Sequence, residues 1–194
     1  MTAERALRAP RAVLDANVLL QAPLRDTLLR AAERRLFVPV WSPAILGEVR
    51  RNLPGLIAHL DQPQARTERL LAALGDAFPD ATVHDYRRLI PRVAIRAEDR
   101  HVVAAAIAGG ARWILTDNLR HFPAPALKPH HVRAVAPDWF LVRLWRRDPT
   151  ALEYILIRQG QALHPPRTIR EILATLQRSA PEFVAHVVSA LAPA

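Results

Sequence analysis

Two short apolar runs in the chain each close on an aspartate. The first reads "AVLD" and ends at Asp15, and the second reads "RWILTD" and ends at Asp117. A carboxylate at the end of a buried strand is costly unless something pairs with it. In open parallel sheets, the carboxyl ends of the strands form the crevice where ligands bind. The two runs therefore predict two strands that deliver acids to one edge of a sheet.

The segments between these runs have helical patterns. Ser42 and Pro43 are typical of an N-cap and a first helical position, and Pro54-Gly55 predicts the end of that helix. Residues 97–110 give the clearest helix, with acids in the first turn and Gly109-Gly110 after the last. Short strands that alternate with helices predict an α/β fold, in which a parallel sheet is covered on both faces.

The pattern changes after Pro137, because only helical segments follow. A chain of 194 residues is long enough for one domain and an appendage. We therefore expect a sheet-containing domain at residues 1–146 and an all-helical extension at residues 147–194.

The charge balance favours an anionic partner. The chain carries 27 basic and 18 acidic residues, a net charge of +9, and nucleic acid is the first class of partner to consider. Only Lys128 is a lysine. A genomic preference for arginine codons explains arginine over lysine, but not the excess of base over acid.

The composition also excludes several classes of protein. There is no cysteine, so disulfides and thiolate metal sites are excluded, which fits a cytoplasmic protein. No apolar run approaches the roughly 18 residues that span a membrane. The first residues, "MTAERALRAPR", lack the apolar core of a signal peptide. We therefore expect a cytoplasmic chain with no membrane segment.

Four acids could meet at the predicted sheet edge. Asp99 begins the helix that leads into the second acid-ending strand, and Glu48 lies in the helix that follows Ser42. Together with Asp15 and Asp117 they would repel one another, and some would take up protons unless a cation intervened. Mg²⁺ or Mn²⁺ suits such a set of oxygen ligands, whereas the histidines show no zinc spacing.

Each acid also has a purely structural interpretation. Asp99 could favour a helix N-terminus, and Glu48 could pair with Arg51 or Asn52 at the surface. Asp15 and Asp117 could be turn residues. The two strand-ending aspartates are harder to dismiss together, because a buried, unpaired charge is costly at both places.

Other side chains near the acids could contact a substrate. Basic residues that flank them are candidates to bind phosphates, although each could be an ordinary surface charge: Arg50, Arg51, Arg100 and Arg120. His101 and His121 lie beside the acids in the sequence and could have a catalytic or phosphate-binding role, but we expect them to be surface polar residues. Trp139, Phe140 and Trp145 could stack on bases, but aromatic residues more often fill cores or interfaces.

Four motifs in order resemble the PIN-domain family. They are "VLDANVLL", a helix carrying Glu48, "EDRHVVAAAIAGGA" and "WILTDNLRHFP", and the similarity spans roughly residues 11–140. The resemblance implies a PIN-like, Rossmann-like α/β fold and a Mg²⁺- or Mn²⁺-dependent nuclease site that acts on RNA. Bacterial relatives are commonly VapC-type toxins held inactive by an antitoxin protein. Homodimers are common among such proteins.

The resemblance also implies roles for individual residues. Asp15, Glu48 and Asp99 match the three core acids of the family. Either Asp117 or Asn118 fills the fourth position, and Asp117 is the acid we select, with Asn118 as its polar support. Asn17 and Thr116 are expected to act as supporting hydrogen-bonding groups.

The function expected from the sequence is therefore that of a metal-dependent endoribonuclease, and the resemblance implies the toxin of a toxin–antitoxin pair. Two alternatives stay open. One is a nucleic-acid-binding or regulatory protein that keeps the fold without catalysis. The other is a housekeeping nuclease that processes RNA.

Overall fold

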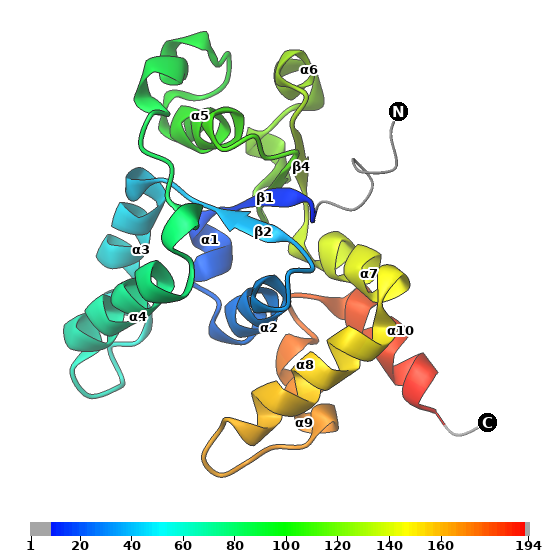
Figure 1. Ribbon diagram of the computed structural model, residues 1–194. Helices are drawn as coiled ribbons and strands as arrows, with labels where there is room; N and C mark the ends of the chain where they lie inside the picture. Colours follow the sequence, from blue (N-terminus) through cyan, green and yellow to red (C-terminus); the bar gives the residue numbers. More distant parts are fainter. Residues whose placement is uncertain (1–8, 193–194) are drawn as a thin grey trace.

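A four-stranded parallel sheet forms the centre of the molecule (Figure 1). The structure is a computed structural model, and it describes residues 9–192. Most of the segment used to argue against a signal peptide lies outside this range. The strand order is β2-β1-β3-β4. The strands are β1 (Arg11–Leu14), β2 (Val38–Val40), β3 (Trp113–Leu115) and β4 (Arg133–Val135).

The sequence of the two central strands explains their position. Val13 of β1 lies opposite Val40 of β2 on one side and Ile114 of β3 on the other, and all three side chains are buried. Continuous apolar runs of this kind are typical of parallel strands covered on both faces. The expected α/β fold is confirmed, and the two strands that precede Asp15 and Asp117 are neighbours.

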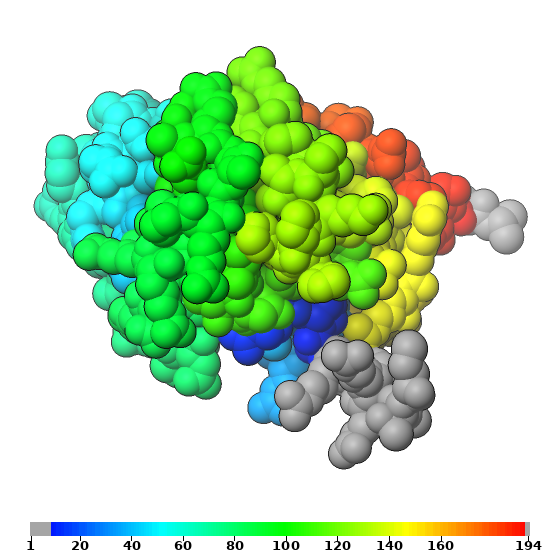
Figure 2. All heavy atoms as spheres, turned by 90° about the horizontal axis from the view of Figure 1, so that it is seen from above, coloured from blue at the N-terminus to red at the C-terminus, as the bar shows by residue number. Residues whose placement is uncertain are grey.

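Helices cover both faces of the sheet. In Figure 1, α5 and α6 lie on one side of it, and α1 and α2 lie on the other. Figure 2 shows residues from the α5 side as the broad green surface. The helices before β4 are α1 (Ala16–Leu19), α2 (Ala22–Glu33), α3 (Pro43–Leu56), α4 (Pro63–Ala77), α5 (Arg100–Ala108) and α6 (Ala124–Leu127), with short 3-10 turns η2 (Pro79–Ala81), η3 (Arg87–Arg92), η4 (Ala97–Asp99), η5 (Leu119–His121) and η6 (Lys128–His130).

Helix α3 begins as predicted but does not end as predicted. The Ser42 side chain accepts a hydrogen bond from the Ile45 N–H at 3.3 Å, and Pro43 is the first helical residue. The helix continues through Pro54, because the Ile57 N–H still donates to the Leu53 carbonyl at 3.1 Å. Proline lacks a donor and its ring crowds the carbonyl four residues earlier, so its effect falls on the preceding turn and the turn that follows can still close.

The chain after β4 is helical, and it shares the hydrophobic core of the sheet domain. Phe140 packs edge-to-face on Phe37, which directly precedes β2, and Trp145 packs in the same way on Phe183. The buried Thr27 hydroxyl of α2 lies 2.7 Å from the Gln159 side-chain oxygen. The helices are α7 (Pro137–Arg147), α8 (Pro149–Gln161), α9 (Ile169–Leu176) and α10 (Pro181–Leu191).

The longest helices described are also interrupted by polar residues. Within residues 9–192, no helix has both the length and the apolar character needed to cross a membrane.

Candidate active site

Asp15 lies at the junction of the two central strands. It follows β1 and serves as the N-cap of α1, with its Oδ1 accepting a hydrogen bond from the Ala16 N–H at 2.8 Å. Its backbone N–H donates to the Leu115 carbonyl at 3.1 Å, which continues the pairing of β1 with β3. The side chain is only 7% exposed. The carboxylate that ends the first apolar run is therefore held inside the carboxyl edge of the sheet.

Two side chains hold the other oxygen of Asp15. The Oδ2 atom accepts hydrogen bonds from the Thr116 hydroxyl at 2.7 Å and from the Asn17 amide at 2.8 Å. Thr116 is fully buried and follows β3, so the two strand ends are joined through this bond. These donors are the ones predicted to support the site. The three hydrogen bonds occupy three of about four acceptor positions on the carboxylate, and they leave one on Oδ1.

The charge on Asp15 is destabilised despite these donors. Burial raises the pKa of Asp15 above its ordinary value, and the hydrogen bonds from Thr116 and Ala16 only partly oppose burial. The nearby Glu48 carboxylate raises the pKa further, whereas His101 lowers it. A carboxylate in this condition is stabilised by any added positive charge.

Glu48 reaches this region from α3. Its Oε1 lies 3.2 Å from the Nε2 of His101 on α5, and both side chains are partly buried. The structure thus directs Glu48 inward to a histidine. Burial lowers the pKa of His101, but the Glu48 contact and the Glu98 carbonyl outweigh burial and raise it above its ordinary value. Asp15 adds to the same effect.

Asp99 stands at the start of α5 but makes no capping hydrogen bond with its side chain. Its Oδ2 lies 3.3 Å from the Nδ1 of His121, and this buried oxygen has no partner with hydrogen-bond geometry among the described residues. Asp99 therefore does not cap α5 through a hydrogen bond, although its position at the start of the helix still suits an acidic residue. It presents an unsatisfied oxygen instead.

Asp117 is placed at the rim of the site and is exposed. Its carboxylate accepts a hydrogen bond from the Gln21 amide, and its backbone N–H donates to the Asn17 side chain at 3.3 Å. The neighbouring Asn118 N–H donates to the Thr116 hydroxyl at 3.1 Å. Both residues considered for the fourth position thus adjoin the Asp15–Thr116 pair.

The chemistry of these groups fits a hard divalent cation. Carboxylate oxygens are the ligands that Mg²⁺ and Mn²⁺ prefer. The unpartnered Asp99 oxygen and the destabilised charge on Asp15 would each be relieved by a cation. As the side chains stand in residues 9–192, no three acidic or histidine side chains are grouped closely enough to hold one. The structure therefore supplies suitable ligands without a gathered cluster.

The arginines predicted to bind phosphates have different surroundings. Arg50 is committed to Glu68, with contacts of 2.7 and 3.1 Å, and the Arg100 Nε donates to the Ile95 carbonyl at 2.9 Å. Arg51 and Arg120 are exposed. Arg50 is exposed as well, so Arg51 and Arg120 differ from it in being exposed without an ion pair among the described residues.

Three residues at the site were not assigned to it from the sequence. His101 and His121 were expected at the surface, yet each lies against one of the acids and is partly buried. Gln21 was not considered, and it contacts Asp117. The available signal was proximity along the chain: His101 is two residues after Asp99, and His121 is four residues after Asp117.

Together, the fold and the site define an α/β domain in which Asp15 and Asp117 follow neighbouring strands of a parallel sheet and Glu48 lies close enough to Asp15 to raise its pKa. The family model described as "PIN domain" matches residues 11–120, which is more than half of the chain. The chain therefore belongs to the PIN-domain family, and the resemblance seen in the motifs is confirmed. The matched range includes all four acids and ends before the C-terminal helices.

One curated protein is similar to part of the chain. It is described as "Putative ribonuclease VapC50" from Mycobacterium tuberculosis, and it is 37% identical over 101 residues. The match covers 52% of this chain and 60% of that protein, so the chain spans less than two thirds of the relative's length. No solved structure matches the chain.

Proposed function

We propose that this protein is an endoribonuclease that hydrolyses RNA phosphodiester bonds with the help of Mg²⁺ or Mn²⁺. The observation that carries the proposal is the buried Asp15 carboxylate. It follows β1 and accepts a hydrogen bond from Thr116, which follows the neighbouring strand β3. Burial and the nearby Glu48 carboxylate raise its pKa. PIN-domain membership and the name of the VapC50 relative support the choice of RNA. The absence of cysteine is in keeping with action in the cytoplasm.

The residues of the chain would divide the work as follows. Asp15, Asp99, Glu48 and Asp117 would provide the oxygen ligands of the cation. When bound, the cation supplies Lewis-acid stabilisation of the charge that develops on the phosphodiester. Thr116 and Asn17 fix the orientation of Asp15. Arg51 and Arg120 would bind phosphates and offset the repulsion between the acids and RNA.

Cleavage of RNA by matched variants tests this proposal. We expect the purified protein to cut a structured RNA in Mn²⁺, and Asp15→Asn to lower the rate about 100-fold or more, because a cation ligand is lost. Asp76→Asn is the control, since Asp76 is an exposed acid on α4. Cleavage by Asp15→Asn at the unaltered rate would refute the assignment. Binding of RNA without any cleavage would favour the non-catalytic alternative.

Cation binding has a separate readout in thermal unfolding. A ligand that binds only the folded state at about 100 times its Kd stabilises that state by roughly 2.7 kcal/mol, which raises the Tm by several degrees. We expect Mn²⁺ to raise the Tm of the unaltered protein and of Asp76→Asn, but not of Asp99→Asn. An equal rise in all three would place the cation elsewhere.

We further propose that the protein is the toxin of a toxin–antitoxin pair, with a small protein as its antitoxin. The likeness to VapC50 supports this role. Induced expression should arrest growth, and co-expression of the product of an adjacent small reading frame should relieve the arrest. Growth without arrest by an RNA-cleaving protein would point to housekeeping RNA processing. A homodimer, which sedimentation would detect, is part of the same proposal.

A further inference from the structure

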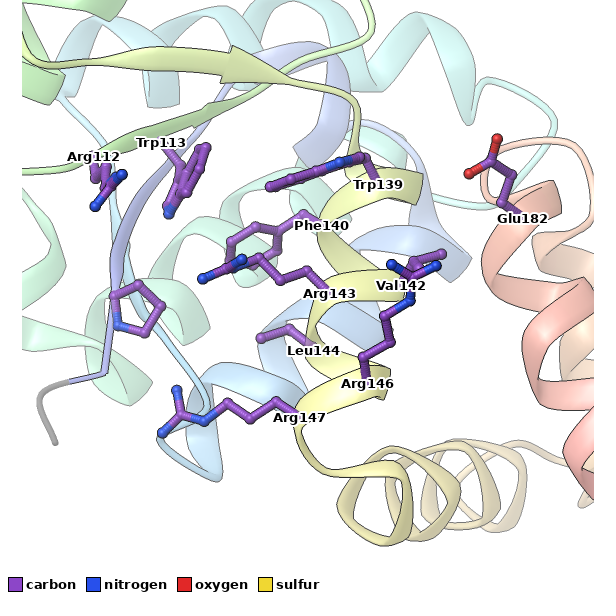
Figure 3. Close-up of a pocket in the computed structure, with 11 residues that line it drawn as sticks. Arg112, Trp113, Trp139, Phe140, Val142, Arg143, Leu144, Arg146, Arg147 and Glu182 are labelled. Atoms are coloured by element: carbon purple, nitrogen blue, oxygen red, sulfur yellow. The ribbon is translucent and has the colours of Figure 1, made fainter. Parts of the chain in front are cut away.

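A basic and aromatic cavity lies at the opposite edge of the sheet from the acids. It has a volume of about 870 Å³ and is lined by residues at the amino ends of β1 and β3 and by α7. Pro10 precedes β1, and Trp113 begins β3. Figure 3 shows Arg143 and Arg147 extending from α7 toward the side on which Arg112 and Trp113 lie.

Trp113 gathers three guanidinium groups, of which those of Arg112 and Arg143 line this cavity. Arg112, Arg133 and Arg143 have their guanidinium carbons 5.4, 5.8 and 5.8 Å from the centre of the Trp113 ring. Cation–π attraction offsets part of the repulsion among like charges held this closely. The Trp113 side chain itself is nearly buried. It therefore acts as a platform that holds arginines at the surface.

Trp139 presents the accessible aromatic surface. Its ring centre lies 5.2 Å from that of Trp113 and 5.9 Å from the Arg143 guanidinium, yet the residue is 41% exposed. Phe140 and Trp145 of the same helix are buried in the core. Of the three aromatic residues that could have stacked on bases, only Trp139 is therefore available.

The charges at the cavity are not neutralised by the described part of the chain. Four arginines and one acid, Glu182, line it. Among the ion pairs between residues 9–192, none involves these arginines or Arg133. Such an excess of accessible guanidinium groups calls for an anionic ligand. The adjacent exposed indole of Trp139 favours a ligand that also has flat aromatic faces on which it can stack.

We propose that this cavity binds single-stranded RNA, with phosphates on Arg143, Arg147 and Arg112 and a base stacked on Trp139. The inference rests on the proposed function, because it takes the bound strand to be part of the RNA that is cut at the acids. Trp113 begins β3 and Asp117 follows four residues later, which corresponds to about 13 Å at roughly 3.3 Å per extended residue. One RNA could therefore reach both edges only by passing around the molecule, so the cavity selects RNAs with an unpaired segment beyond the cleavage point.

Binding without cleavage tests the cavity directly. The protein is kept in EDTA and titrated with a fluorescent oligo(U) longer than the roughly 16 nucleotides that one single-strand-binding domain covers. We expect Trp139→Ala to weaken binding about 5- to 150-fold, the range for loss of one stacked base. Trp139→Leu keeps apolar bulk and should lose nearly as much. Equal affinity of both variants and the unaltered protein would overturn the proposal.

The role of charge has its own control. Arg143→Ala should weaken binding and reduce the slope of log affinity against log salt by about 0.7, the value for one contact to a single strand. Arg170→Ala is the control, because Arg170 is an exposed arginine on α9 that does not line the cavity. An equal loss in both variants would show attraction by net charge alone, and would overturn the assignment to this cavity.

Three further outcomes separate this proposal from the alternatives. If polyglutamate of equal charge displaces oligo(U) as well as unlabelled oligo(U) does, the site takes an acidic polypeptide and the RNA proposal fails. If the protein binds oligo(U) through Trp139 but cuts no RNA in Mn²⁺, the nuclease proposal fails and this one stands. If RNA is cut and Trp139 has no effect on affinity, the reverse holds.

Discussion

Asp15 is the residue on which the proposed site depends, because it brings a buried carboxylate to the carboxyl edge of the sheet. An acid that ends a buried apolar run has to be satisfied locally, and Thr116, Asn17 and the Ala16 N–H do so. The family resemblance had also predicted Thr116 and Asn17 as supporting hydrogen-bonding groups. His101 and His121 could not be assigned in this way, because their contacts join separate segments. Periodicity gives the face of a helix, but not the side chain that this face meets.

The raised pKa of Asp15 predicts a pH-dependent stability. In the metal-free folded protein Asp15 keeps its proton to higher pH than in the unfolded chain. Its contribution is therefore fully present below about pH 4 and is lost as the pH rises through the folded-state pKa, at about 1.4 kcal/mol per unit of pKa difference. Urea unfolding in EDTA should show Asp15→Asn gaining stability relative to the unaltered protein as the pH rises above about 4. Parallel pH profiles would contradict the burial argument.

The Thr116 hydroxyl predicts a second effect at the same place. Thr116→Val removes a donor from Asp15 and an acceptor from the Asn17 amide and the Asn118 N–H. Leaving such buried groups unpaired costs about 1–3 kcal/mol each, so chemical denaturation should show a clear loss of stability. Thr116→Ser keeps the hydroxyl and should retain most of it. A Thr116→Val variant as stable as the unaltered protein would contradict the role given to these hydrogen bonds.

At the scale of elements, turn chemistry predicted starts better than ends. Ser42 and Pro43 located the beginning of α3, because an N-cap hydrogen bond is a local interaction. Pro54 misplaced its end, because a proline near the last turn removes one donor without clashing with later residues. The strands were found from apolar runs of three or four residues, which only the alternation with helices distinguished from short buried helical segments.

Two glycines inside helices predict opposite effects of the same substitution. A Cβ on Gly160 of α8 would lie 2.1 Å from the Arg167 backbone carbonyl oxygen, whereas one on Gly75 of α4 would meet nothing within 4 Å. Gly160→Ala should destabilise the protein by about 1–3 kcal/mol, since backbone must move. Gly75→Ala should stabilise it by about 0.5–1 kcal/mol. Guanidinium unfolding measures both, and a neutral Gly160→Ala would mean that the segment at Arg167 yields easily.

At the scale of the whole molecule, the helices after residue 147 pack against the sheet domain and share its hydrophobic core. The division at 147 came from a change of pattern, which shows that helices replace strands but not where those helices pack. In the structure the Asp138 carboxylate of α7 accepts from the Glu182 and Phe183 N–H groups, at 3.0 and 2.8 Å, at the start of α10. The hydrophobic core continues across the division.

A truncation after Arg147 tests this dependence. Leu152, Leu156 and Phe183 are buried, so deleting α8–α10 would expose the apolar side chains that pack against them. We expect the fragment to aggregate or to lose its cooperative thermal transition, whereas the full chain unfolds in one step. A soluble fragment with a Tm within a few degrees of the full chain would show instead that residues 147–194 form a separable extension.

The central strands are only three or four residues long, and this shortness has a practical consequence. The proposed cleavage site and the proposed RNA-binding cavity lie at opposite ends of these strands, with the buried core of the sheet between them. Substitutions in the cavity beside Trp139 should therefore change which transcripts the protein binds and leave the candidate active site intact. The two sites could then be engineered independently.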